Sequence, residues 1–132
     1  MRHAALVGLA VVVALWMTAA PASAQAQKLV RADIPFQFVI EGKTLPAGRY
    51  DVSLTASNLL QIRDAKGNGQ ALAYVTRLAQ REGSGEHTTE LIFDKTDTQN
   101  VLSEVWSTGQ DGFYLAGTKG AHTHVRVKGG PY

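Results

Sequence analysis

The residues from Arg49 to Thr55 alternate strictly between polar and apolar side chains, with Tyr50, Val52 and Leu54 in the apolar positions. A period of two places the apolar side chains on one face of an extended strand, whereas a helix would scatter them around its axis. The pattern therefore predicts a β-strand with one buried and one solvated face. We expect Tyr50, Val52 and Leu54 to be core positions.

The same period recurs in short runs that are separated by Gly, Pro, Asn and Asp. The predicted strands cover residues 29–34, 36–40, 49–55, 59–63, 71–78, 88–94, 101–107 and 113–116. No segment carries a sustained helical period. About seven or eight strands at this spacing predict an all-β fold, a single antiparallel β-sandwich over residues 25–116, with a small closed β-barrel as the alternative. Residues 117–132, which contain Gly, His and Thr, form either a C-terminal tail or an edge strand over 121–128.

The first 24 residues have the pattern of a signal peptide. Arg2 is followed by an apolar run over residues 4–17, and Pro21 precedes the small-residue tripeptide Ala22-Ser23-Ala24. The run is too short for a membrane span, which needs about 20 apolar residues. We expect cleavage after Ala24, export to the periplasm or the medium, and no stable transmembrane segment after cleavage.

Composition excludes several classes of function. The chain has no cysteine, so disulfide frameworks, thiolate metal sites and cysteine nucleophiles are excluded. It carries 13 Lys and Arg against 11 Asp and Glu, a formal net charge of +2, without a basic cluster. We therefore expect no nucleic-acid partner.

Two strands carry further expectations about side-chain direction. In the strand over 71–78, we place Leu72, Tyr74 and Leu78 on the inner face. In the strand over 101–107, Glu104 alternates with Leu102 and Trp106, so a buried Glu104 would need an arginine partner. We expect this partner to be an arginine of a neighbouring strand, such as Arg31, Arg49 or Arg77.

Three segments carry a family resemblance: Val30 to Phe36 (VRADIPF), Gly42 to Tyr50 (GKTLPAGRY) and Leu102 to Trp106 (LSEVW). With them the chain resembles a group of small exported bacterial β proteins of unassigned function. The resemblance covers residues 30–106 and implies a domain type and an export route. The ending departs from the group's short basic tail, because residues 117–132 are longer and contain Gly, His and Thr.

Few residues are candidates for chemistry. His122 and His124 would project to one side of a strand and could share a metal ion, and His87 could join them if its loop came near. We expect instead that these histidines are incidental, that the chain has no metal site and no cofactor, and that it is not an enzyme. Ser103 lies in no Gly-x-Ser-x-Gly elbow. The carboxylates Glu90, Asp94, Asp97 and Glu104 are interpreted as solvated strand-face charges.

The function expected from the sequence is that of an exported, non-enzymatic β domain that binds an unidentified protein or has a structural role in the cell envelope. The alternative is a domain that binds a small molecule, either a lipid or a carbohydrate, and the third possibility is a small hydrolase. Trp106 and Tyr114 are the candidate binding aromatics. A filled core with an exposed edge strand would favour protein binding by strand addition.

Overall fold

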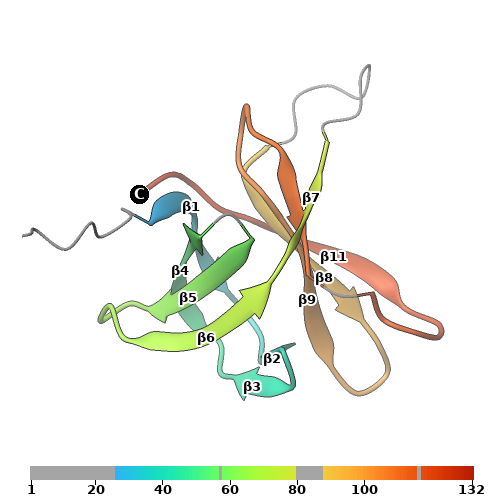
Figure 1. Ribbon diagram of the computed structural model, residues 1–132. Helices are drawn as coiled ribbons and strands as arrows, with labels where there is room; N and C mark the ends of the chain where they lie inside the picture. The colour runs from blue at the N-terminus through green and yellow to red at the C-terminus, as the bar shows by residue number, and fades with distance from the viewer. Residues whose placement is uncertain (1–25, 57, 80–87, 116) are drawn as a thin grey trace, which may run out of the picture.

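The computed structural model describes residues 26–56, 58–79, 88–115 and 117–132. Within these ranges the chain forms eleven β-strands and no helix, which confirms the predicted all-β class (Figure 1). No helix among these residues is long and apolar enough to cross a membrane. The predicted signal peptide and His87 lie outside the described residues.

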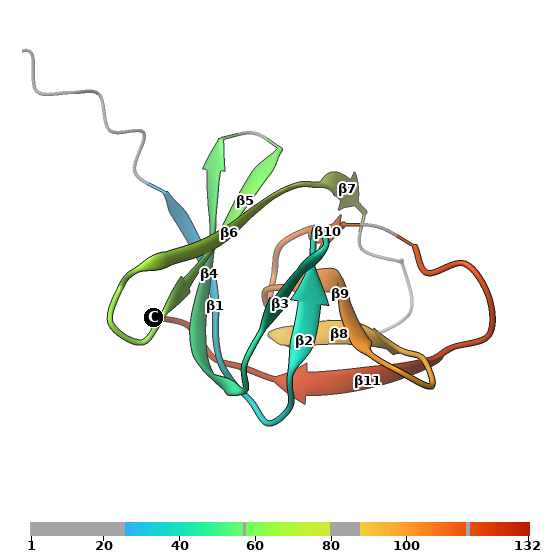
Figure 2. The same cartoon turned by 90° about the horizontal axis from the view of Figure 1, so that it is seen from below.

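The strands form two sheets that pack face to face (Figure 2). The first sheet is antiparallel and has the order β1 (Gln27–Ile34), β4 (Gly48–Ala56), β5 (Leu59–Asp64), β6 (Gly69–Tyr74). The second sheet has the order β11 (Thr123–Lys128), β8 (Glu90–Lys95), β9 (Asn100–Trp106), β10 (Gly112–Tyr114), β7 (Thr76–Leu78). A hairpin of β2 (Phe38–Ile40) and β3 (Lys43–Leu45) joins this sheet where Val39 pairs with Val101 of β9.

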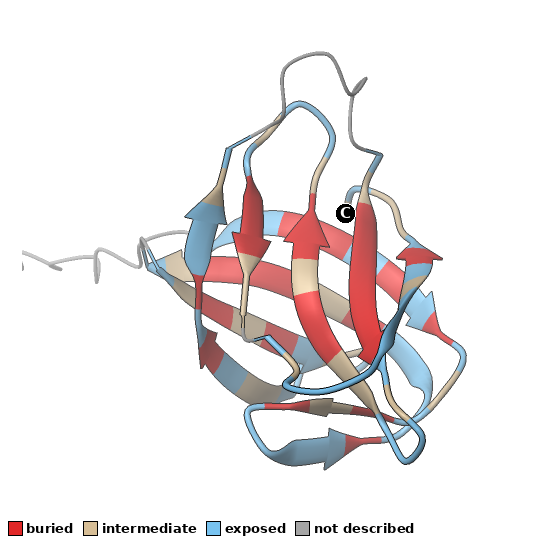
Figure 3. Ribbon diagram, turned by 90° about the vertical axis from the view of Figure 1, so that its right-hand side faces the viewer, coloured by how far each residue is buried: buried red, intermediate tan, exposed pale blue. Residues whose placement is uncertain are grey.

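The core lies between the two sheets, and both contribute side chains to one hydrophobic cluster. Figure 3 shows in red the buried residues of both sheets. Tyr50, Val52 and Leu54 are 4%, 0% and 6% exposed, which confirms the face predicted from their alternation. Phe38 meets Tyr50 edge to face, with ring centroids 5.2 Å apart, and meets Phe93 of the second sheet at 5.6 Å. The contact of Phe38 with Tyr50 connects the two sheets, whereas its contact with Phe93 lies within the second sheet.

The segment predicted as one strand over 71–78 is divided between the two sheets. Val75 separates β6 from β7, and each of these strands pairs in a different sheet. The prediction that Leu72 and Tyr74 face inward is wrong: they are 54% and 71% exposed, and Ala73 is buried. A period of two defines two faces without stating which face is inward, and here the alanine face packs on the core.

The strand predicted over 101–107 contains a β-bulge. Ile92 pairs with Glu104 and Phe93 with Leu102, so Ser103 is the additional residue of β9. Leu102 therefore joins the main core, whereas Glu104 does not share its face. The expectation that these two side chains lie on one face with Trp106 is wrong, because the bulge reverses the alternation.

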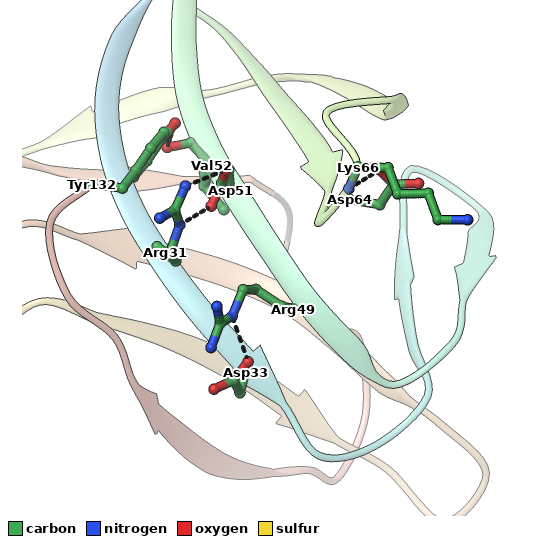
Figure 4. A network of polar contacts seen from close by, with 8 residues as sticks. All are labelled: Arg31, Asp33, Arg49, Asp51, Val52, Asp64, Lys66 and Tyr132. Carbon is green, nitrogen blue, oxygen red and sulfur yellow. Dashed lines mark hydrogen bonds and ion pairs between the residues drawn. The ribbon is translucent and has the colours of Figure 1, made fainter.

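The buried glutamate of the second sheet is Glu90, which is 3% exposed. Its Oε1 accepts a hydrogen bond from Nη1 of Arg126, at 3.3 Å. Two of the arginines considered as partners for Glu104 are paired elsewhere, Arg31 with Asp51 and Arg49 with Asp33 (Figure 4). The pairing of Glu90 joins β8 to β11 across the edge of the sheet.

The C-terminal residues are ordered, and they return to the first sheet. After β11, Gly130 exchanges two backbone hydrogen bonds with Arg31 of β1, of 2.8 and 2.9 Å. The Tyr132 hydroxyl then donates to the Val52 carbonyl at 3.0 Å, and the Arg31 guanidinium lies 5.1 Å from the centre of the Tyr132 ring (Figure 4). Of the two expectations for residues 117–132, the edge strand is the one that the structure contains.

Candidate functional site

The two edges of the first sheet differ in how their backbone groups are satisfied. At the β1 edge, Gly130 covers Arg31 with paired hydrogen bonds. At the opposite edge, no described strand pairs with the free side of β6. Unpaired strand edges are templates for another chain, and proteins usually cover or charge them. The β6 edge is therefore a candidate interaction site.

The backbone groups that β6 presents can be assigned from the pairing with β5. The Val75 N–H donates to the Asn58 carbonyl at 2.9 Å, just beyond the last residue pair of these strands. Hydrogen-bonded and non-hydrogen-bonded pairs alternate along an antiparallel ladder. The N–H and C=O groups of Ala73 therefore point toward β5, whereas those of Leu72 and Tyr74 point to the free side.

Side chains at this edge are apolar and uncharged. Leu72 and Tyr74 are the exposed large hydrophobic residues among those that the structure describes. They lie on the outer face of the sheet, where Tyr74 pairs with Leu59 and Leu72 with Gln61. Lysine is a common protective residue at strand edges, and here Lys43 Nζ donates to the carbonyl of Gln70, at the start of β6. No other described strand or lysine pairs with this edge, so among the described residues the segment from Leu72 to Tyr74 is left open.

A second cluster lies at the β11 edge of the other sheet and brings together two residues that the sequence singled out. His124 is the direct cross-strand partner of Asp94, and His122 precedes β11 by one residue. The His122 and His124 rings meet edge to face, with centroids 5.2 Å apart. One ligand atom from each of Asp94, His122 and His124 lies within 4.8 Å of the others. The arrangement could hold a metal ion.

The two carboxylate oxygens of Asp94 differ in their hydrogen bonding. Asp94 is 2% exposed, and its Oδ2 accepts a hydrogen bond from the Thr118 backbone N–H at 3.3 Å. Its Oδ1 lies 3.2 Å from His124 Nδ1 and 3.9 Å from His122 Nε2, yet it accepts no hydrogen bond from any described residue. The 3.2 Å approach therefore lacks the alignment of a hydrogen bond. Asp94 is not the solvated strand-face charge that the sequence suggested.

The other candidate residues are not brought together. Trp106 is 4% exposed and packs against Gly112, so its ring is almost entirely buried. Tyr114 is partly buried, on β10. The Ser103 hydroxyl is buried and donates to the Ile92 carbonyl at 3.1 Å, which places it away from any solvent-accessible cleft.

A surface cleft of about 480 Å³ opens between the β2–β3 hairpin and the connection from β8 to β9. Its lining includes Thr96, whose Oγ1 accepts from the N–H groups of Thr98 and Gln99, and Asn100, whose side chain donates to the Gln37 carbonyl. These polar groups are bonded within the protein. The cleft therefore offers a small molecule fewer free partners than its lining suggests.

Electrostatics at the two edges of the first sheet are set by burial and local hydrogen bonds. Burial raises the pKa of the Tyr132 phenol above its usual value, with the Asp51 charge acting in the same direction. Near β6, hydrogen bonds from the backbone N–H groups of Asn68 and Lys66 help to lower the pKa of Asp64. The Tyr132 phenol holds the C-terminal segment on β4, and the Asp64 carboxylate holds the turn between β5 and β6.

The sequence singled out His122 and His124 as a possible metal pair but predicted neither the free edge of β6 nor the contribution of Asp94. The uncharged run Ala71-Leu72-Ala73-Tyr74 is typical of an unprotected edge, but the same residues also predict a core strand. The His-x-His spacing is visible in the sequence. The third residue of the cluster, Asp94, is brought to the histidines only by the register in which β11 pairs with β8. No protein-family model, curated protein or solved structure matches this chain.

Proposed function

We propose that this chain is an exported, non-enzymatic β domain that binds an extended segment of a partner protein as an additional strand on β6. The observation that carries the proposal is the free β6 edge, with the backbone groups of Leu72 and Tyr74 directed away from the sheet. An added strand would bond to these groups and continue the order β1-β4-β5-β6 by one strand.

The contrast between the two edges of the sheet supports this function. The β1 edge is covered at Arg31, where Gly130 forms an isolated bridge, and the Tyr132 ring lies beside the side chains of Lys28 and Arg31. A β6 edge that no described strand covers is a liability for aggregation unless a partner occupies it. The continuous core cluster also favours binding at the surface over binding of a lipid in the interior.

The exposed side chains define the chemistry of the partner segment. Leu72, Tyr74 and the neighbouring Leu59 form an apolar strip on the outer face. Cross-strand neighbours contribute about 0.2 to 1 kcal/mol per pair when aromatic or β-branched side chains face one another. The partner should therefore be an extended segment with apolar, preferably β-branched or aromatic, residues at alternate positions and no Pro in the paired stretch.

Export rests on residues 1–24, and its test is direct. The apolar run and Ala22-Ser23-Ala24 predict a mature chain that begins at Gln25. N-terminal sequencing of the protein from the periplasm or medium should start at Gln25. Recovery of the Met1 terminus in the membrane fraction would contradict the export proposal.

Binding is tested by selection from a displayed library of random peptides, followed by affinity measurements on three proteins. Leu72→Pro removes one edge N–H that is not used in the ladder to β5, and proline is tolerated at strand edges. Leu72→Ala is the matched control, because it loses the side chain but keeps the N–H. Selected peptides should show alternating apolar residues and bind Leu72→Pro at least about tenfold more weakly than Leu72→Ala, equivalent to about 1.4 kcal/mol.

The selection can also overturn the proposal. Peptides that bind both variants equally would show that the backbone of β6 is not used. A wild-type protein that selects no peptide, or that pairs with a second copy of itself through β6 in size-exclusion chromatography, would likewise contradict binding of a partner protein at this edge. Circular dichroism of both variants verifies that each retains the β fold.

A further inference from the structure

The cluster of Asp94, His122 and His124 is not needed for binding at β6, because it lies at the β11 edge of the other sheet. It combines one carboxylate and two imidazoles, the ligand types that bind transition-metal ions in proteins. Three features of its geometry indicate that the three side chains face a common cation position.

The first feature is the orientation of His122. Its Nδ1 lies 2.9 Å from the carbonyl oxygen of Gly120. A carbonyl can only accept, so this hydrogen bond assigns the proton to Nδ1 and leaves the lone pair of the neutral ring on Nε2. Nε2 is the atom that faces Asp94 Oδ1, at 3.9 Å. Histidines that bind metals commonly donate their other ring N–H to a backbone carbonyl in this way.

The second feature is the unsatisfied oxygen of Asp94. The carboxylate is buried, and the N–H of Thr118 holds its Oδ2. That leaves Oδ1 without a hydrogen bond from a described residue, on the side where both imidazoles lie. A buried carboxylate oxygen that accepts no hydrogen bond is unfavourable, and a cation placed between it and the ring nitrogens would satisfy it.

The third feature is spacing. Metal–nitrogen and metal–oxygen bonds of about 2.0 to 2.2 Å place neighbouring donors of a tetrahedral site about 3.4 Å apart. Asp94 Oδ1 lies 3.2 Å from His124 Nδ1 and 3.9 Å from His122 Nε2, and one donor atom of each of the three residues lies within 4.8 Å of the others. The donors therefore need to approach one another by at most about 1.4 Å to close on an ion. The cross-strand pairing of His124 with Asp94 maintains this spacing.

We propose that Asp94, His122 and His124 bind a divalent first-row transition-metal ion of the zinc or copper type. Two imidazoles favour these ions over Mg²⁺ and Ca²⁺, which prefer oxygen ligands. The three side chains leave at least one coordination position for water or an outside ligand. That position lies on the solvent side, because the His124 side chain is 59% exposed whereas that of Asp94 is 3% exposed.

The test is isothermal titration of the metal-free protein, purified after expression of the full chain, with Zn²⁺, Cu²⁺ and Mg²⁺ as probes. We expect one equivalent of Zn²⁺ or Cu²⁺ to bind, Cu²⁺ more tightly, and no binding of Mg²⁺. Asp94→Asn removes the charged ligand at nearly constant shape. Asp97→Asn is the matched control, since Asp97 is exposed on the same hairpin and lies outside the cluster.

Asp94→Asn and His122→Ala should each weaken Zn²⁺ binding by more than the about 10- to 100-fold that loss of an outer-shell partner costs. Asp97→Asn should bind as the wild type does. Binding of Co²⁺ gives a second readout, because its visible spectrum should lose intensity in Asp94→Asn. An unchanged affinity in Asp94→Asn, equal losses in Asp94→Asn and Asp97→Asn, or no binding to the wild type would overturn the proposal. Circular dichroism without metal verifies that each variant is folded.

Discussion

Gly129 and Gly130 are adjacent in the segment that covers β1, yet substitution by alanine should affect them very differently. A Cβ at Gly129 would lie 2.5 Å from Val30 Cγ1 and 2.8 Å from the Arg31 carbonyl oxygen. A Cβ at Gly130 would meet nothing within 4 Å. The pair therefore tests how closely the C-terminal segment is packed against β1.

The loss in free energy of unfolding expected for Gly129→Ala follows from these contacts. Ordinary contacts of a Cβ begin at 3.4 Å, so Gly129→Ala requires a displacement of about 0.9 Å against Val30, which is 0% exposed and belongs to the core. Overpacking of this kind costs about 1 to 3 kcal/mol. The displacement also strains the two hydrogen bonds between Arg31 and Gly130, each contributing about 0.5 to 1.5 kcal/mol. We expect Gly129→Ala to lower the free energy of unfolding by about 2 to 4 kcal/mol.

Urea titration measures the difference. With a slope of about 1.5 kcal/mol per molar urea, Gly129→Ala should lower the midpoint by about 1.3 to 2.7 M. Gly130→Ala should leave it nearly unchanged or raise it slightly, because alanine restricts the unfolded chain. Equal midpoints for the two variants would refute the close packing of the C-terminal segment on β1.

Four further outcomes follow from the same structure. Val52→Ala, at a fully buried position, should cost about 2 to 4 kcal/mol in urea titration, whereas Tyr74→Ala, at an exposed one, should change stability by about 0.5 kcal/mol or less. Gly112→Ala places a Cβ 2.6 Å from the Trp106 ring, so it should destabilise the protein and alter the near-ultraviolet circular dichroism of the tryptophan. Because the pKa of Asp64 is lowered in the folded state, Asp64 contributes to stability above its unfolded pKa, and this contribution is lost as pH falls through the folded pKa. Asp64→Asn should therefore make the free energy of unfolding less dependent on pH in acid. Burial raises the pKa of the Tyr132 phenol. Its contribution to stability is therefore present below about pH 10 and is lost as pH rises through the folded pKa. Tyr132→Phe should reduce the phenolate absorbance that appears late in an alkaline titration.

The two faces of a regular strand were predictable from sequence, but which face is inward and where the regularity stops were not. Tyr50, Val52 and Leu54 are buried as their period requires, because both neighbours of β4 pair along that stretch. At Ser103 a single bulged residue reverses the alternation, and nothing in the local sequence marks it. Predictions of the side-chain face are therefore valid only as far as the next bulge.

The free edge and the metal cluster both depend on which strands are neighbours. Leu72 and Tyr74 are among the largest apolar side chains of their segment, so size alone favoured an inward position for them. Only the sheet order shows that β6 has no described neighbour on one side. Asp94 and His124 are 30 positions apart in the chain, and the pairing of β8 with β11 brings them together.

Hydrogen exchange at individual backbone amides of β6 tests the proposed function most directly. In the free protein, the amides of Leu72 and Tyr74 should exchange rapidly, whereas that of Ala73, which bonds to β5, should be protected. Adding a peptide selected on the wild-type protein should slow exchange at Leu72 and Tyr74 and leave Ala73 unchanged. Protection of Leu72 and Tyr74 in the free monomer, or no change on peptide addition, would contradict strand addition at β6.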